Sequence, residues 1–444
     1  MKFMSFFRLF FLILMLPFGI SGQNYTSYII GNKTDLLTFP QGGVCIMGGG
    51  AENDDAMKWF LQQSSGGDVL VLRTTGDNGY NNYLYQQLKV KVNSVETIVF
   101  NNKQASEEHY IHQKIMQAEA IWFAGGDQWD YISFWRNTKI DSLINDAILT
   151  RNIVIGGTSA GMAIQGGLYF TAQNGTVTSA EALANPYNSR MKIDSAVFLK
   201  NKYLENVITD THYDDPDRRG RHSVFLGRIL SDWNIQARGI ASEANSAICI
   251  DPSGIARCYG DYPKYDDNLY FLQPNCENAS SGPENCTIGN PLEWNRDQQA
   301  IKVYKVKGTS TGNNYFDLND WKTGTGGTWE NWYIIGGVLY TNSGSEINCS
   351  TEAHNNPLKG EPEIRVYPNP LSDDKLNLQF QGIKVEKITI FDVCGKVVKT
   401  IDGQIIDSFC IDISDLKPGV FVLVLQTNPT GIRPVRFVLK SHRF

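Results

Sequence analysis

Histidine is scarce in this chain, with six among 444 residues. Dense runs of lysine and arginine are missing and the formal net charge is −6, which argues against nucleic-acid binding. No Cys/His spacing has the form of a zinc site. After the N-terminus no apolar run approaches the length of about 18 residues that a membrane span needs. These absences leave an ordinary globular chain with few candidate bases.

The N-terminal segment has the pattern of an export signal. Lys2 and Arg8 precede a short apolar run at residues 9–16, and Ser21 and Gly22 follow as small residues. We predict a signal peptide over residues 1–22 and an exported protein, secreted or displayed at the cell surface after passing through the periplasm. Because no cysteine stands at the predicted cleavage site, we do not expect a lipid anchor.

Eight cysteines in an exported chain favour disulfides. The best candidate pair brackets a polar loop, a second could bridge strands of the C-terminal part, and a third flanks a predicted turn. Cys45 lies in an apolar run and is predicted to be a buried thiol. The predicted pairs, in order of preference, are Cys276–Cys286, Cys394–Cys410 and Cys249–Cys258.

Short β-branched runs alternate with helix-like segments from residue 43 to about residue 160. This alternation predicts an α/β fold with a mainly parallel, doubly wound sheet. Sites in such sheets form at the carboxyl ends of the strands. Three glycine-rich segments follow predicted strands, at residues 48–50, 125–128 and 156–161. We therefore expect these three segments to meet at one edge of the sheet.

The chain is predicted to hold four parts. Residues 23–345 form the main domain, whose later part is a β-rich extension that starts with a hairpin at residues 246–259. Residues 346–364 are polar and predicted to be a linker. Short alternating strands over residues 365–444 predict a small C-terminal β-sandwich. The signal peptide over residues 1–22 is the fourth part.

Residues 157–161 read Gly-Thr-Ser-Ala-Gly, the G-x-S-x-G pattern of a nucleophile elbow. In an elbow a strand turns sharply into a helix and presents the serine hydroxyl, which predicts Ser159 as a nucleophile. The alternative is a glycine-rich turn that only packs tightly or holds a phosphate. One oxyanion donor is expected from the N–H of Ala160 and the second from Gly126, with Asp127 and Gln128 lining the substrate pocket.

A serine nucleophile needs a base and a group that orients the base. His212 ends an apolar run and is the predicted base, the alternatives being a structural histidine at this position and His222 as the base. Glu243, which ends another strand-like run, is the predicted acid. Glu181 and Asp210 are the competing acids.

Residues 40–260 resemble cyanophycinases and the related aspartyl dipeptidases. The resemblance rests on matching segments at residues 48–50, 123–128, 156–161, 210–213 and 239–247. It implies a class I glutamine amidotransferase-like fold, Ser159 as nucleophile, His212 as base and an acidic third member. It also implies cleavage at aspartyl residues, as in β-aspartyl-arginine units, without a metal or organic cofactor. Because members are often dimers, a homodimer is expected.

Two departures from the cyanophycinase pattern concern the substrate. Thr211 stands where the family has glutamine, and the arginines after His212 are displaced to positions 218, 219 and 221. Arg218, Arg219 and Arg221 are still predicted to bind an acidic substrate group, because guanidinium forks suit carboxylates. The alternative is a surface loop of salt bridges. The family's Asp-Glu pair falls at Glu243-Ala244, which keeps one carboxylate.

The last 80 or so residues resemble the C-terminal sorting domain of type IX secretion substrates. The matching segments are residues 367–370, 391–396 and 413–420 and the final basic strand. The export machinery is then an expected partner, and an adhesive β-sandwich is the alternative. Together these features predict an exported serine peptidase acting on acidic or aspartyl-containing peptides. A catalytically inactive surface-displayed binding protein and an esterase with the same elbow are the alternatives.

Overall fold

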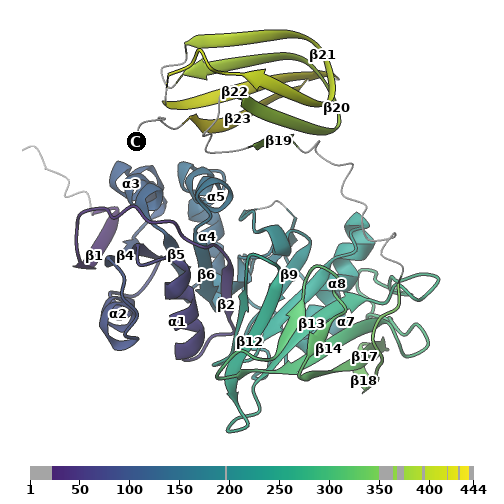
Figure 1. Cartoon of the computed structure of the whole chain (residues 1–444). Coiled ribbons are helices and arrows are strands. Elements are labelled where there is room, and N and C mark those ends of the chain that lie inside the picture. The colour runs from purple at the N-terminus through teal and green to yellow at the C-terminus, as the bar shows by residue number, and fades with distance from the viewer. Residues whose placement is uncertain are drawn as a thin grey trace, which may run out of the picture. The chain divides into compact units, whose positions relative to one another are not determined.

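The computed structural model describes residues 23–195, 198–349, 364–367, 375–392, 396–417, 419–428 and 431–439. The predicted signal peptide, residues 350–363 of the predicted linker, and Cys394 with its predicted disulfide lie outside the described residues. The chain divides into two compact units, residues 1–350 and residues 351–444 (Figure 1). Over the described part of the chain, no helix has both the length and the apolar character needed to cross a membrane.

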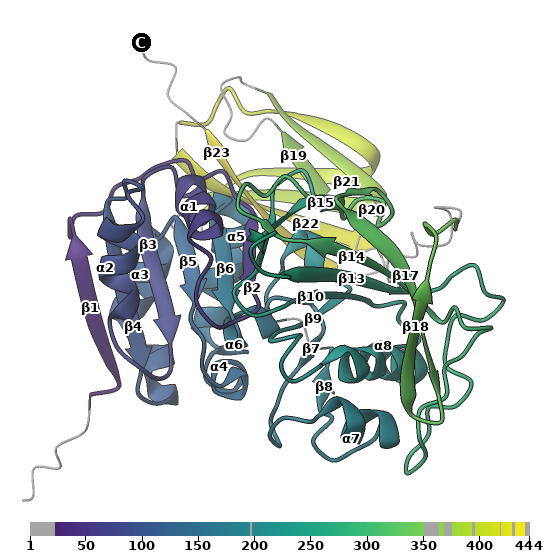
Figure 2. The same ribbon diagram turned by 90° about the horizontal axis from the view of Figure 1, so that it is seen from below.

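The first unit contains a ten-stranded sheet, whose five central strands are parallel. These five, β4, β3, β5, β6 and β2, lie side by side in Figure 2. The remaining strands join antiparallel at the two sides. In sheet order the strands are β1 Tyr25–Gly31, β4 Ser94–Phe100, β3 Asp68–Arg73, β5 Ala120–Phe123, β6 Val154–Thr158, β2 Val44–Met47, β11 Ala247–Ile250, β12 Ile255–Tyr262, β15 Tyr315–Asp317 and β16 Gly324–Thr325.

Helices cover both faces of this sheet, which explains why its central strands are apolar throughout. Successive strand residues point to opposite faces. In β2, Val44 and Ile46 join the core under α3, α4 and α5, whereas Cys45 and Met47 join the core under α1. The helices are α1 Asp54–Gln63, α2 Gly79–Asn82, α3 His109–Gln117, α4 Gln128–Trp135, α5 Lys139–Arg151, α6 Ala160–Ala163, α7 Ser179–Ala184 and α8 Arg219–Trp233, and three further helical turns are η1 Tyr83–Gln87, η2 Lys103–Glu107 and η3 Lys202–Leu204.

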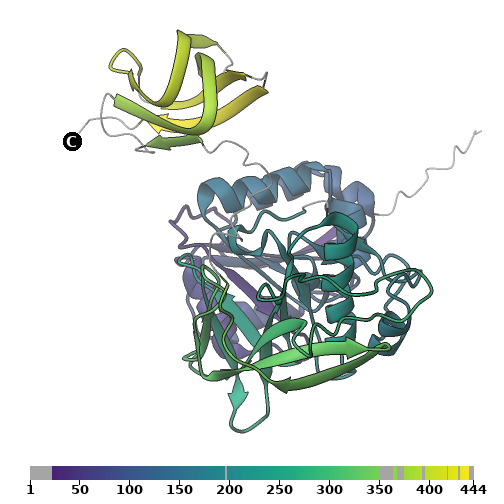
Figure 3. The same ribbon diagram turned by 90° about the vertical axis from the view of Figure 1, so that its right-hand side faces the viewer.

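A second, six-stranded sheet follows, antiparallel except for its parallel pair β9–β10 (Figure 3, residues 268–343 in green). The α/β class is therefore confirmed, with a parallel centre and a large β-rich part. The runs that end near His212 and Glu243 lie in this second sheet rather than in the sheet of Ser159. In sheet order its strands are β18 Val338–Ser343, β17 Gly327–Ile335, β14 Ile301–Lys307, β13 Asn268–Pro274, β10 Arg238–Ser242 and β9 Val207–Asp210; a small pair, β7 Tyr169–Phe170 and β8 Ile193–Asp194, stands apart.

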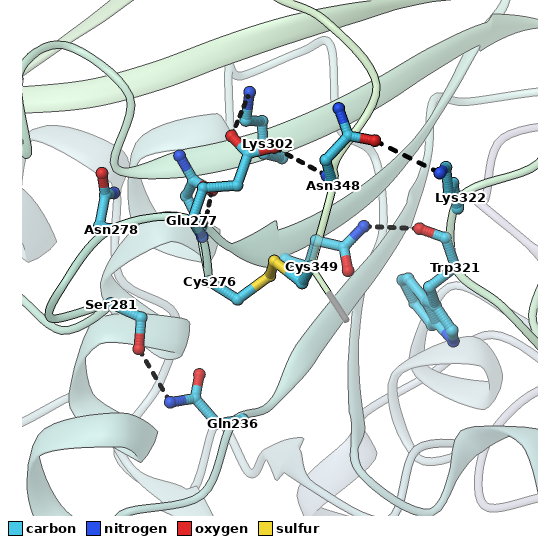
Figure 4. Close-up of a disulfide and its surroundings, with 12 residues drawn as sticks. Gln236, Cys276, Glu277, Asn278, Ser281, Lys302, Trp321, Lys322, Asn348 and Cys349 are labelled. Atoms are coloured by element: carbon cyan, nitrogen blue, oxygen red, sulfur yellow. Dashed lines mark hydrogen bonds and ion pairs between the residues drawn. A yellow bond between two sulfur atoms is a disulfide. The ribbon is translucent and has the colours of Figure 1, made fainter. Parts of the chain in front are cut away.

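The disulfide of the first unit joins Cys276 to Cys349, with Cα atoms 6.0 Å apart (Figure 4). The predicted Cys276–Cys286 pair is therefore wrong, because Cys286 packs against the apolar core of the second sheet instead. Around the bond, Glu277 pairs with Lys302 at 3.2 Å and accepts the Asn348 N–H at 2.7 Å.

The predicted Cys249–Cys258 pair is also wrong, since both residues are free. In the β11–β12 register Cys258 lies opposite Ile248, one residue away from Cys249. An offset of one residue places the two side chains on opposite faces of the sheet. Cys45 is a buried thiol, as predicted.

The second unit is a β-structure with its own apolar core, formed by residues such as Leu376, Ile388 and Leu423. Its described strands pair into one sheet in the order β19-β20-β22-β23, with β21 on β20. The long strands β20 and β21 are bulged where the register shifts. The strands are β19 Ile364–Tyr367, β20 Lys375–Asp392, β21 Val397–Asp412, β22 Gly419–Asn428 and β23 Gly431–Leu439.

Candidate active site

Ser159 stands in a strained turn between β6 and α6. Its backbone angles are φ 52° and ψ −114°, a combination that non-glycine residues rarely adopt. The turn closes tightly, since a Cβ added at Gly157 would lie 2.6 Å from the carbonyl carbon and oxygen of Gly161. The local geometry is thus that of a nucleophile elbow, with a half-buried serine at its tip.

The His212 imidazole lies against this serine. Ser159 Oγ is 2.9 Å from His212 Nε2, so the hydroxyl can donate to that nitrogen when it carries no proton. The end of β2 holds both residues: Met47 O accepts the Ser159 N–H at 3.1 Å, and Gly48 O accepts the His212 N–H at 2.7 Å. Although β6 and β9 belong to different sheets, β2 thereby fixes the pair in one place.

The surroundings of His212 favour the neutral imidazole. Burial lowers its pKa below the ordinary value, and the positive charge of Arg218 lowers it further. Asp214 and Asp210 act in the opposite direction, but the net shift is downward. A neutral ring at neutral pH is the form that accepts a proton.

Two backbone N–H groups stand beside the elbow without an internal acceptor. Among the described residues, neither Gly126 nor Ala160 donates its N–H to a backbone carbonyl. Gly125 lies over the serine, since a Cβ there would be 3.6 Å from Ser159 Cβ. The Tyr131 hydroxyl donates to Ala124 O at 2.8 Å and so fixes the loop that carries Gly126. Within the described part of the chain, both N–H groups are therefore without a backbone acceptor next to the segment that carries Ser159.

The Glu243 carboxylate is directed toward β13 in the structure. It accepts the Asn268 N–H at 2.7 Å and the Tyr270 hydroxyl at 2.8 Å. Burial raises its pKa, whereas the bonds from Tyr270 and Asn268 lower it. Among the described residues, none of its hydrogen bonds goes to His212.

Asp214 is a second acid near the imidazole, and sequence reasoning missed it. Its Oδ1 accepts the Ala244 N–H at 3.1 Å, which links the segment after His212 to the segment after Glu243. Its charge favours the protonated form of His212. The signal available in the sequence was its position two residues after the predicted base.

The other candidates for base and acid are engaged elsewhere. Glu181 caps the start of α7 and pairs with Arg190. His222 is fully buried between the Tyr213 hydroxyl at 3.1 Å and Ile208 O at 3.2 Å, and burial lowers its pKa to about 4. Asp210 forms a buried ion pair with an arginine of α8.

The three predicted substrate-binding arginines differ in how free they are. Arg221 is buried, and its guanidinium donates to both oxygens of Asp210 and to Thr176 Oγ1. Arg219 is held by Asp217 at 2.6 Å. Arg218 donates to Thr211 O at 2.9 Å, but its buried Nε has no hydrogen-bond partner among the described residues. Arg218 is therefore the arginine best able to accept a further ligand.

Asp127 and Gln128 lie at the start of α4, next to Gly126. The Asp127 carboxylate caps the helix by accepting the Trp129 N–H at 2.8 Å. Gln128 is half-buried and donates to Phe170 O at 3.0 Å. Both residues therefore have local structural roles next to Gly126.

Two parts of the chain match models of known protein families. Residues 49–185 match the model of peptidase family S51, and residues 365–438 match the model of the secretion system C-terminal sorting domain. These two matches confirm, at the level of the family, both resemblances that the sequence predicted. None of the curated proteins matches the chain.

Two solved structures that resemble about half of this chain are described as peptidases. A peptidase from an acI-B1 Actinobacterium is 13% identical, with a TM-score of 0.38, covering 50% of this chain and 89% of its own. A putative peptidase E protein from Listeria monocytogenes EGD-e is 16% identical, with a TM-score of 0.31, covering 48% of this chain and 95% of its own.

The two family matches support a secreted peptidase. The S51 match includes the elbow of Ser159 and the loop of Gly126. The sorting-domain match implies interaction with the type IX secretion machinery and export to the cell surface or beyond it.

Proposed function

We propose that this protein is an exported serine peptidase that hydrolyses peptide or isopeptide bonds at aspartyl residues, of the β-aspartyl-arginine type, through a covalent acyl-enzyme. The observation that carries the proposal is the 2.9 Å contact between Ser159 Oγ and His212 Nε2 at a strained elbow. The family match at residues 49–185 supports it.

In this mechanism Ser159 Oγ attacks the scissile carbonyl carbon while His212 Nε2 takes the hydroxyl proton. The N–H groups of Gly126 and Ala160 stabilise the negative oxygen of the tetrahedral intermediate. His212 then gives the proton to the leaving nitrogen, the C–N bond breaks, and an ester to Ser159 remains. Water, with its proton taken by His212, hydrolyses the ester and restores the serine.

We propose Glu243 as the acid of the triad, with Asp214 as the competitor that the structure adds. Hydrogen bonds of catalytic groups are often loose before substrate binds and tighten in the complex. The Asp214–Ala244 hydrogen bond couples the two segments, so a small shift of either segment moves both carboxylates relative to His212.

We propose that Arg218 receives the acidic group of the substrate. Its unpartnered Nε and its influence on the pKa of His212 support a place beside the reacting bond. Arg219 and Arg221 would hold this region in shape through Asp217 and Asp210. Asp127 and Gln128 would line the pocket on the side of the oxyanion hole.

The test is labelling with a fluorophosphonate probe followed by peptide mass spectrometry, with β-aspartyl-arginine substrates assayed in parallel. We expect an adduct on Ser159 and turnover of the substrates, both abolished in Ser159→Ala. Ser142→Ala, an exposed serine of α5, serves as a matched control that keeps both. Absence of the adduct together with absence of turnover would refute the proposal.

The alternatives make different predictions for the same variants. An esterase would turn over short-chain esters with a base other than His212, yet His222 is buried with both ring nitrogens engaged. A surface-displayed binding protein would retain every measurable property in Ser159→Ala. The strained backbone at Ser159 is a reason to favour an enzyme, since such strain is concentrated at functional sites.

A further inference from the structure

The backbone of His212 is held in an uncommon conformation. Its φ angle is 46°, in the left-handed region that few residues other than glycine adopt. Such a conformation persists only where the surrounding structure holds it. One contact that holds it is the 2.7 Å hydrogen bond from the His212 N–H to Gly48 O. The place of the proposed base therefore depends on the loop that follows β2.

This loop, residues 48–51, also packs against the reacting nitrogen of the imidazole. A Cβ added at Gly49 would overlap both Nε2 and Cε1 of His212, so the loop backbone lies directly on the ring. Gly49 and Gly50 have φ angles of 100° and 78°, which glycine adopts far more readily than other residues. Because glycines contribute no side chains that could fix the loop, its shape depends on contacts from outside.

The turn at residues 243–246 supplies these contacts through Asn245. Gly49 O accepts the Asn245 N–H at 2.7 Å, and the Ala51 N–H donates to Asn245 Oδ1 at 2.8 Å. A Cβ added at Gly50 would lie 2.5 Å from the same Oδ1, so the side chain lies close against the loop. Asn245 thus binds the loop on both sides of Gly50.

The Asn245 side chain has no second structural task among the described residues. It is exposed, and the hydrogen bond to the Ala51 N–H is the one that its carboxamide forms there. Its own φ of 63° is a conformation that asparagine tolerates better than most residues. Replacement of this side chain should therefore change the stability of the protein little. Its effect should fall on the loop that packs against His212.

We propose that Asn245 is a positioning residue, which holds the loop of residues 48–51 and thereby keeps the His212 imidazole aligned with Ser159 Oγ. Asn245 acts through the loop backbone, since none of its hydrogen bonds among the described residues goes to Ser159 or His212. This inference rests on the proposed peptidase function, because the alignment matters for the rate only if His212 takes the serine proton.

Asn245→Gly tests the proposal, because glycine keeps the left-handed backbone and its N–H and removes only the side-chain bond. We expect fluorophosphonate labelling of Ser159, per folded molecule, to slow about tenfold, roughly the factor that one hydrogen bond contributes. With β-aspartyl-arginine peptides, kcat should fall by the same factor and KM should change little, since alignment of the base acts on the reaction step. Asn245→Asp keeps an acceptor oxygen for the Ala51 N–H and should restore most of the rate above the acid limb.

The titration of His212 separates positioning from a general loss of stability. The charged groups that act on the ring among the described residues are Arg218, Arg221, Asp214 and Asp210, and Asn245→Gly leaves all of them in place. Burial is the largest cause of the lowered pKa of His212. When the loop loosens, water reaches the imidazole, so this pKa should rise toward the ordinary value of about 6.5 in Asn245→Gly. The acid limb of the labelling rate should move to higher pH with it.

Asn234→Gly is the matched control. Asn234 is also an exposed asparagine in the left-handed region, with φ 55°, but it stands at the end of α8. This variant should keep the native labelling rate and the native titration of His212. Native labelling together with an unmoved titration in Asn245→Gly would refute the positioning role, and so would a slow rate that Asn245→Asp does not restore.

Nuclear magnetic resonance of the imidazole in the full chain separates failure of this inference from failure of the proposed function. The titration of His212, assigned with His212→Gln, requires no turnover. Absence of Ser159 labelling and of turnover in the native chain would refute the peptidase function. The titration then decides the positioning by itself: a raised pKa of His212 in Asn245→Gly establishes that Asn245 holds the imidazole in place, and an unchanged pKa refutes it.

Discussion

Replacing Gly157 with alanine tests whether the tight elbow positions the nucleophile. The added Cβ would lie 2.6 Å from the carbonyl carbon and oxygen of Gly161. Ordinary contacts between carbon and backbone atoms begin near about 3.4 Å, so the two segments must separate by roughly 0.6–0.8 Å. The segment that moves begins α6 and carries Ser159 and Ala160 with it.

The expected cost has two parts. Overpacking of a tight interior costs about 1–3 kcal/mol of folding free energy, which corresponds to a few degrees in Tm. The displacement of the proposed nucleophile and oxyanion donor is expected to cost more in rate, because a shift of about 1 Å reduces catalysis on the order of 100-fold. Activity should therefore fall far more than stability.

The assay is the rate of Ser159 labelling by the fluorophosphonate probe, corrected for the folded fraction, with Tm measured by calorimetry. Gly308→Ala is the matched control, since its Cβ would lie 2.5 Å from Tyr259 O, a similar backbone clash outside the elbow. It should lower Tm to a similar extent and leave labelling per folded molecule intact. Equal labelling rates in Gly157→Ala and the native chain, or equal losses in both variants, would refute the reasoning.

Two further predictions concern the imidazole. Glu243→Gln is expected to lower kcat by about 10³-fold and Asp214→Asn by less than about tenfold, as a kinetic comparison of the two will show; the reverse order would make Asp214 the acid. Because burial and then Arg218 lower the pKa of His212, the acid limb of the kcat/KM profile should lie below the ordinary imidazole value of about 6.5. Removing the charge in Arg218→Gln should raise this pKa and move the limb to higher pH, whereas Arg218→Lys should retain it; an unchanged limb in Arg218→Gln would contradict this account.

Local patterns in the sequence were sufficient to predict the elbow and its neighbours. Gly157 and Gly161 indicate a turn that side chains would obstruct. The apolar run before them indicates the strand that leads into this turn. His212 was predicted as the partner because it ends an apolar run, and its Nε2 lies 2.9 Å from Ser159 Oγ. In these cases the information lies within a few residues of the site.

Features that depend on contacts between distant segments were not predictable in the same way. The partner of Cys276 lies 73 residues away, and its choice depends on how β14 to β18 fold back. Cys249 and Cys258 do not pair because the register between β11 and β12 offsets them by one residue. The direction of the Glu243 carboxylate is set by Asn268 and Tyr270 on β13, which no local pattern reveals.

The Cys276–Cys349 bond determines how force passes through the first unit. Cys349 is the last described residue before the boundary between the two units. Tension applied through the second unit therefore reaches Cys349 before the other described residues of the first unit. The covalent bond then carries the load to Cys276, just after β13, and bypasses everything between residues 277 and 348. Strands β14 to β18 therefore carry no load. When the chain is pulled by its second unit, the tension passes directly to the middle of the second sheet.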